Sequence, residues 1–235
     1  MRYTFNERKE AAKVDDSSVL LRCPLFSGLT DEELSFALTF FQAREARYEK
    51  GAFLNRIGSP LPAFGLVLEG SVQVNLDDMD GQTMILQTVS PGGTFGESLN
   101  FLQSETFIYI TAFTDVRILW LRTDRVRDIR NAADRSEEAL ITRFITMLAR
   151  RTLSMNDRIQ VLSQKSIRKK LIAFFTQERL RYGDSFTLPF DRNSMAVYLG
   201  TDRTALSREL SAMKKEGIID FHKNRFSVLS KFENS

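Results

Sequence analysis

An uninterrupted helical stretch in the middle of the chain most restricts the possible folds. Neither glycine nor proline occurs between Asp134 and Leu162, and a helix of that span would be about 44 Å long. Steps of four and three separate seven positions along it, six of them apolar: Ile141, Ile145, Leu148, Thr152, Met155, Ile159 and Leu162. This period is typical of a coiled-coil seam. We therefore expect these residues to form a dimer interface; an ordinary amphipathic core helix is the alternative.

The segment before this helix has the pattern of a small β structure. Short apolar or alternating runs are punctuated by glycines from about Ala43 to Leu121. Two strands are expected within residues 64–74, and Asp78–Gly81 predicts a turn before a further strand at Thr83–Val89. Many short strands at even spacing predict a small β-barrel or β-roll.

Short helices are expected on both sides of these two regions. Residues 1–17 are polar and predict a loose arm, and Ser17 to Phe41 predicts short helices with a cap at Thr30. After the long helix, Ser166 is the expected cap of a helix over Ile167–Arg181. The long helix therefore joins an N-terminal β region to a C-terminal helical region.

The sharpest local pattern lies in the C-terminal region. Ser194–Leu199 predicts a short helix, Gly200 allows a left-handed turn, and either Thr201 or Asp202 can cap a second helix that ends near Glu216. This spacing is that of a helix-turn-helix, in which the second helix enters the major groove of DNA. A helical hairpin used only for packing is the alternative.

The second of these helices and the segment after it carry groups that can contact DNA. Arginine can bond guanine through two hydrogen bonds, and serine and threonine can reach base edges or phosphates. Residues 218–228 predict a β-hairpin with a basic tip suited to a phosphate contact. The predicted DNA contacts are Arg203, Thr204, Ser207, Arg208, Lys223 and Arg225.

The distribution of charge agrees with this division. The whole chain has a formal net charge of only +3. Residues 163–235 hold 14 Lys or Arg and 8 Asp or Glu, a net of +6, while the remainder holds 19 and 22, a net of −3. A basic C-terminal third attached to a slightly acidic body suits a nucleic-acid partner. The alternative is that the basic excess of residues 163–235 only reflects charged side chains on solvent-exposed helix faces.

Composition excludes several classes of protein. The chain is 43% hydrophobic and 27% charged, which is ordinary for a globular protein. No apolar run approaches the roughly 20 residues of a membrane span, and the N-terminus lacks a signal-peptide core. A single cysteine, Cys23, cannot hold an iron–sulfur cluster, and a single histidine, His222, leaves almost no scope for zinc chemistry. Neither residue lies in the predicted β region, so haem is not expected there either. We expect a cytoplasmic protein without cofactor, metal or enzymatic activity, and Cys23 as a core thiol.

From about Val19 to Leu229 the chain resembles the CRP/FNR family of bacterial transcription regulators. The motifs that carry the resemblance are Leu25–Leu29, Phe95-Gly96-Glu97, Leu199-Gly200 followed by Thr204–Leu210, and the glycines Gly51, Gly58, Gly70 and Gly81. The resemblance implies an α+β fold: an N-terminal double-stranded β-roll (a jelly roll of the cyclic-nucleotide-binding type), a long dimerisation helix and a C-terminal winged helix-turn-helix. In much of the family the Thr204 position is a glutamate that reads cytosine, so we expect a different operator there.

The effector region departs from the family's cyclic-nucleotide pattern. In nucleotide-responsive members an Arg-Ser or Arg-Thr pair follows Gly-Glu about ten residues later; the arginine neutralises the cyclic phosphate and the glutamate binds the ribose hydroxyl. Here the arginine position holds Glu105, Thr106 or Phe107, depending on the gap, so cyclic AMP is not expected to bind. By position alone, the residues expected to contact an effector are Glu97, Ser98, Thr106, Tyr109 and Asn156.

These observations predict a homodimeric, sequence-specific transcription regulator controlled by an unidentified small molecule. The predicted domains are 1–130 (arm, helices and β-roll), 131–162 (dimerisation helix) and 163–235 (winged helix). The expected partners are double-stranded DNA with a pseudo-palindromic operator, a second copy of the chain, RNA polymerase and the effector, and no membrane. A cyclic-nucleotide-binding module that acts through protein contacts is the alternative. A cupin-like enzyme comes third, because the β region offers no histidine to a metal.

Overall fold

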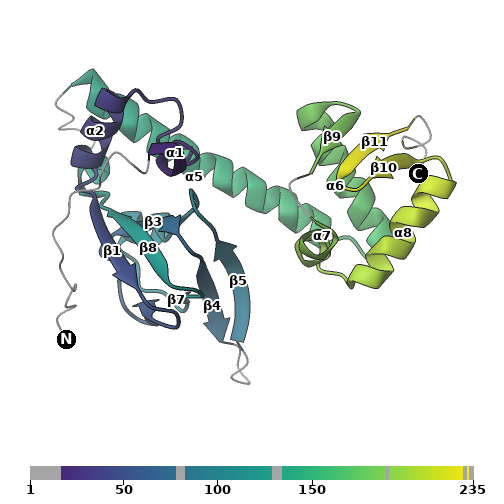
Figure 1. Cartoon of the computed structure of the whole chain (residues 1–235), viewed down its shortest axis with the longest axis horizontal. Coiled ribbons are helices and arrows are strands. Elements are labelled where there is room, and N and C mark those ends of the chain that lie inside the picture. Colours follow the sequence, from purple (N-terminus) through teal and green to yellow (C-terminus); the bar gives the residue numbers. More distant parts are fainter. Residues whose placement is uncertain (1–16, 78–82, 129–133, 189–190, 230–231, 233–235) are drawn as a thin grey trace. The chain divides into compact units, whose positions relative to one another are not determined.

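The computed structural model describes residues 17–77, 83–128, 134–188, 191–229 and 232. It divides into two compact units, Met1–Ala149 and Arg150–Ser235, and most of their helices and strands are labelled in Figure 1. The predicted turn at Asp78–Gly81, and the predicted arm apart from Ser17, lie outside the described residues. The fold is mixed α and β with a long central helix, as the sequence predicted.

Two four-stranded antiparallel sheets form the centre of the first unit. One sheet has the strand order β1-β8-β3-β6 and the other has the order β2-β7-β4-β5. The strands are β1 (Arg44–Tyr48), β2 (Phe53–Asn55), β3 (Phe64–Glu69), β4 (Val72–Asp77), β5 (Thr83–Val89), β6 (Thr94–Phe95), β7 (Tyr109–Ala112) and β8 (Val116–Leu121). These two sheets confirm the β-roll that the spacing of the strands predicted.

Apolar side chains fill the space between the two sheets. Residues alternate between the faces of a strand, so that Val72 and Val74 of β4 and Ile110 of β7 join one buried cluster with residues of the other sheet. In that cluster the Phe95 and Trp120 rings lie edge to face with centroids 5.5 Å apart. The roll interior is therefore built from aliphatic and aromatic groups.

Short helices cover a second core in the same unit. They are α1 (Ser17–Leu20), α2 (Asp31–Phe40), α3 (Glu97–Leu102) and α4 (Asp124–Arg127). Thr30 caps α2 in a capping box with Glu33, as the sequence predicted for Thr30. Cys23 is fully buried in this core, and burial raises the pKa of Cys23 to about 11. The thiol is therefore protonated at neutral pH, which confirms its interpretation as a core group.

Gly70, between β3 and β4, is needed for both its conformation and its size. Its φ is +77°, and a Cβ atom there would lie 2.1 Å from the Asp115 carbonyl oxygen. Gly70→Ala is therefore expected to lower the free energy of unfolding by about 2–6 kcal/mol, through backbone strain and overpacking together. Gly58→Ala is the matched control, because Gly58 has a φ of +73° and open space around it. Urea unfolding that gave equal losses for both variants would contradict this explanation.

Helix α5 (Arg135–Leu162) runs for 28 residues and confirms the predicted long helix. Its first turns belong to the core of the first unit, where Phe144 is fully buried and Ile141 is 2% exposed. The expectation that Ile141 belongs to a dimer seam is therefore wrong, because its side chain is already buried within its own chain. Within the described ranges, no helix is both long and apolar enough to cross a membrane.

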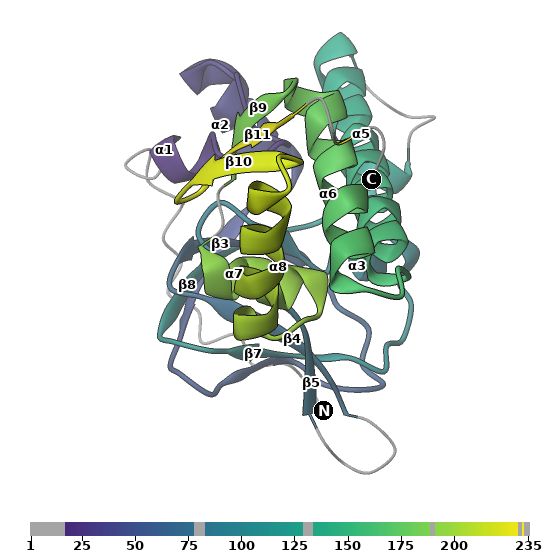
Figure 2. The same cartoon turned by 90° about the vertical axis from the view of Figure 1, so that its right-hand side faces the viewer.

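The second unit begins inside α5 and contains a helix-turn-helix and a small sheet. After α5 come α6 (Ile167–Tyr182), β9 (Ser185–Thr187), α7 (Arg192–Leu199), α8 (Arg203–Lys215), β10 (Ile219–His222) and β11 (Arg225–Val228). The strands form an antiparallel sheet in the order β10-β11-β9, and Figure 2 shows this sheet together with α6, α7 and α8. The predicted hairpin and both predicted helices of the winged helix-turn-helix are confirmed.

Candidate nucleic-acid interface

Two aspartates set the beginnings of the two helices of the helix-turn-helix. Asp191 accepts a hydrogen bond from the Ser194 amide at 2.7 Å, and Asp202 accepts from the Thr204 and Ala205 amides at 2.7 and 2.9 Å. These backbone bonds lower the pKa of both carboxyl groups, so both stay ionised at neutral pH. Of the two caps that the sequence left open for α8, the structure shows Asp202.

Packing of α8 on its neighbours determines which of its faces meets solvent. Leu206, Leu210 and Met213 are fully buried, in one cluster with Ala196 and Leu199 of α7. Gly200 between the helices has a φ of +56°, the left-handed turn expected for it. The opposite face of α8 is left to solvent.

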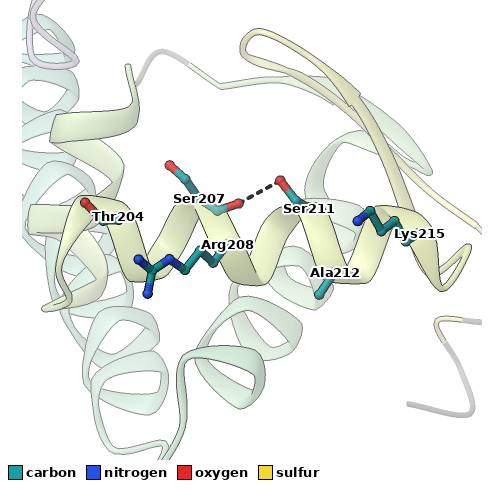
Figure 3. Close-up of a pocket in the computed structure, with 6 residues that line it drawn as sticks. All are labelled: Thr204, Ser207, Arg208, Ser211, Ala212 and Lys215. Atoms are coloured by element: carbon teal, nitrogen blue, oxygen red, sulfur yellow. Dashed lines mark hydrogen bonds between the residues drawn. The ribbon is translucent and has the colours of Figure 1, made fainter.

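The solvent face of α8 carries hydroxyl and cationic groups. A shallow depression on it, drawn in Figure 3, is lined by Thr204, Ser207, Arg208, Ser211, Ala212 and Lys215. Ser211 donates a 2.9 Å hydrogen bond to the Ser207 carbonyl oxygen, so its hydroxyl is already engaged along the helix. The side chains of Arg208 and Lys215 are exposed. None of the six residues is acidic, which suits a polyanionic partner.

Sequence reasoning found the beginning of this face and missed its end. Thr204, Ser207 and Arg208 are brought together as expected, and Arg203 is exposed at the first position of α8. Lys215 was missed, although it lies seven residues after Arg208 and therefore on the same side of the helix. The spacing alone could have identified it.

The hairpin of β10 and β11 adds a second basic element. Its register pairs His222 with Arg225, which leaves Lys223 and Asn224 as a two-residue turn. Lys223 and Arg225 are both exposed, as expected for groups that contact phosphates. The turn and the face of α8 belong to the same compact unit.

Arg168 of α6 binds the two glutamates of the α8 region. Its guanidinium bonds Glu216 through both terminal nitrogens, at 2.5 and 2.7 Å, and its Nε atom lies 2.6 Å from Glu209. The bond to Arg168 lowers the pKa of Glu216. Neither glutamate lines the depression on α8, so the acidic groups of this helix are held apart from the hydroxyl and cationic face.

The residues expected to contact an effector differ in their exposure to solvent. Glu97 is buried and accepts a hydrogen bond from the Thr94 hydroxyl, whereas Ser98 is exposed. Thr106 is buried, and its hydroxyl accepts from the Ile108 amide at 3.1 Å. Asn156 is exposed on α5 in the second unit.

Tyr109 of β7 lies on the outer face of its sheet. Its neighbour Ile110 points into the roll, so strand alternation turns Tyr109 to the outer face of the sheet. There its hydroxyl donates to Asp77 at 2.9 Å and its ring lies 5.8 Å from that of Phe53. The sequence did not reveal this outward position, and the expected contact of Tyr109 with an effector stays a prediction.

A β-roll followed by a long helix and a winged helix-turn-helix defines a class of DNA-binding regulators, and comparison with known proteins agrees. Residues 45–132 match the cyclic nucleotide-binding domain model, and residues 169–231 match the Crp-like helix-turn-helix domain model. The chain is 29% identical over 197 residues to the cyclic AMP receptor protein of Thermus thermophilus, covering 83% of this chain and 88% of that protein. The chain belongs to the CRP/FNR family of transcription regulators.

Solved structures show the same fold. The OCPA-complexed structure of CprK matches with a TM-score of 0.60 at 20% identity, covering 86% of this chain and 93% of that one. The structure of DNR from Pseudomonas aeruginosa matches with a TM-score of 0.50 at 20% identity, covering 96% and 99%. The global nitrogen regulator of Synechococcus elongatus is a further relative, 21% identical over 192 residues, which cover 78% of this chain and 85% of that protein.

Proposed function

We propose that the protein is a homodimer that binds a pseudo-palindromic operator in double-stranded DNA and acts on RNA polymerase in the cytoplasm. The observation that carries this proposal is the face of α8, where exposed hydroxyl and cationic side chains share one side of a helix without a carboxylate. A helix of this kind fits the major groove. The predicted contacts Arg203, Thr204, Ser207 and Arg208 begin that face, and Lys215 extends it.

The dimer is supported by the part of α5 that the chain does not bury itself. Ile145, Met155 and Ile159 are 48%, 59% and 60% exposed, and Thr152 and Leu162 continue the same stripe. Apolar groups in a 3.5-residue repeat gain free energy when a second helix covers them. A two-fold dimer would place its α8 helices in successive major grooves, so half-sites about 10 bp apart are expected.

In-vitro selection tests this function directly. The full-length protein is presented with random duplexes at physiological salt, and the bound DNA is sequenced. A two-fold symmetric motif is the expected result. Selected pools without a shared motif, or a motif without symmetry, would contradict sequence-specific binding by a dimer.

We further propose that the roll responds to a small molecule other than cyclic AMP. From Ile57 to Val116 the sequence has no Lys, Arg or His, and it has seven Asp or Glu. Of the arginines that flank this stretch, Arg117 pairs with Glu45 and Glu69 at 3.2 and 2.9 Å, and Arg56 stacks on an aromatic ring. Most of the roll therefore offers no cationic side chain to neutralise a cyclic phosphate. This favours a neutral or cationic effector.

Thermal unfolding with added ligand tests the effector proposal, because a ligand that binds the folded state raises the melting temperature. Cyclic AMP is expected to leave the melting temperature unchanged, and a fraction of small molecules from cell extract is expected to raise it. A rise with cyclic AMP alone would reject the proposal. DNA binding without any small molecule would show instead that the roll needs no effector.

Arg225 at the wing is expected to contact a phosphate and no base. Arg225→Ala should therefore weaken binding to all sequences alike and reduce the slope of log K against log salt by about one per subunit. Filter binding over a salt series measures both effects. Arg47→Ala is a suitable control, because Arg47 is an exposed arginine of β1 in the other unit and should leave the slope unchanged. A sequence-dependent loss at Arg225 would contradict a pure phosphate contact.

A further inference from the structure

The side chain of Arg192 is held inside the DNA-binding unit, although it begins α7, where it could reach a phosphate. Its Nη2 atom donates a 2.8 Å hydrogen bond to the Lys223 carbonyl oxygen, and Nη1 lies 3.8 Å from the Met195 sulfur. Partial burial lowers the pKa of Arg192, but a guanidinium remains charged at neutral pH. A partly buried cation of this kind is stabilised by partners within the protein.

Aromatic rings of the wing supply those partners. The guanidinium carbon of Arg192 lies 4.9 Å from the ring centre of Phe221 and 5.0 Å from that of Phe226. Phe221 also lies 5.1 Å from the ammonium of Lys214 on α8, which donates to the Phe221 carbonyl oxygen at 3.0 Å. The Phe221 ring thus contacts one cation from each helix of the helix-turn-helix.

The same contacts reach the turn of the wing. Lys223 has a φ of +53°, a conformation that costs free energy in a residue with a Cβ atom. The Arg192 hydrogen bond is made to the carbonyl of this residue. Asn224 exchanges two 2.9 Å hydrogen bonds with Leu188, through its side chain and its carbonyl oxygen. Both residues of the turn are therefore tied to the body of the unit.

We propose that Arg192 is a positioning residue that holds the wing turn against α7, so that Lys223 and Arg225 meet the DNA backbone together with the face of α8. This inference rests on the proposed DNA binding. Ordering the turn before binding removes an entropy cost from the complex. A planar guanidinium can stack on the rings and donate to the carbonyl at once, which a lysine ammonium cannot do in the same geometry.

A double-mutant cycle separates positioning from direct contact. Arg225→Ala is expected to lower DNA affinity about tenfold in the wild-type background and about threefold or less in the Arg192→Ala background, because a displaced wing no longer delivers Arg225 to its phosphate. Arg192→Lys keeps the charge, so it should restore binding only if Arg192 contacts phosphate itself. Additive losses in the cycle, or full rescue by lysine, would overturn the proposal.

Hydrogen exchange of the free protein gives a measurement that does not depend on DNA. Backbone amides of the wing, residues 221–225, should exchange at least about tenfold faster in Arg192→Ala and Arg192→Lys, while amides of α8 keep their rates. Unchanged wing rates in the lysine variant, whose aliphatic stem preserves packing, would reject the positioning role. If the wild-type protein showed no salt-dependent DNA binding, the proposed function would fail, and the exchange data would still decide the role of Arg192.

Discussion

Met155→Glu combined with Ile159→Glu is expected to give a folded monomer. Both side chains are about three-fifths exposed on α5, at 59% and 60%, so the chain's own core does not need them. Burying two carboxylates at adjacent positions of a helix seam would cost several kcal/mol per helix pair. Sedimentation velocity should show half the wild-type mass, with an unchanged circular dichroism spectrum. Operator affinity should fall by a factor of about 10²–10⁴, because the two half-sites would no longer be bound by two DNA-binding units joined in one dimer.

Leu153→Glu is the matched control for this variant. Leu153 lies on the same helix and is 63% exposed, but it lies off the 3.5-residue stripe of Met155 and Ile159. It should remain dimeric and should bind its operator with nearly wild-type affinity. A dimer that persisted in the double variant would place the interface elsewhere in the chain.

Arg203→Ala is expected to relax base preference at one position of each half-site. Arg203 is exposed at the first position of α8, where the recognition helix approaches base edges. Loss of a two-bond contact to guanine should cost about 1–3 kcal/mol per half-site. Repeating the selection with the variant checks this, because one position of the motif should lose information while the others keep it.

Arg225→Ala is the natural comparison in the same selection. It should weaken binding and leave the motif unchanged, since the wing is expected to contact phosphates. An unchanged motif with Arg203→Ala would remove that residue from base reading. A changed motif with Arg225→Ala would assign base reading to the wing.

Local backbone chemistry made much of the second unit predictable. Gly200 permits a turn that other residues resist, and Ser166 caps α6 with a 3.3 Å bond from the Lys169 amide. Such signals depend on a few neighbouring residues, so they can be read from the chain itself. The strand β4 could likewise be predicted from its own residues, because apolar and polar side chains alternate along it with the period of two that is typical of a strand.

Features that depend on distant packing could not be read in this way. The helical period puts Ile141 on the dimer stripe, but the core formed by α1 and α2 reaches that far along α5 and buries it. The face of the sheet on which Tyr109 lies depends on the register of β7. The sequence motifs do not fix that register to within one residue, and a shift of one residue moves every side chain of the strand to the other face. The contacts of Arg192 join residues about 30 positions apart, so the sequence showed only another arginine near a DNA-binding helix.

The binding of Glu209 and Glu216 by Arg168 has a consequence for the kinetics of encounter. The DNA-binding unit is polarised: the hydroxyl face of α8 carries cations and no carboxylate, whereas Glu209 and Glu216 lie off that face in ion pairs with Arg168. In the field of a polyanion such a dipole experiences a torque as well as an attraction, so the unit would turn its reading face toward the duplex before contact. Productive collisions should then be more frequent than a net charge of a few units alone would produce, and this gain should fade as salt shortens the range of the field.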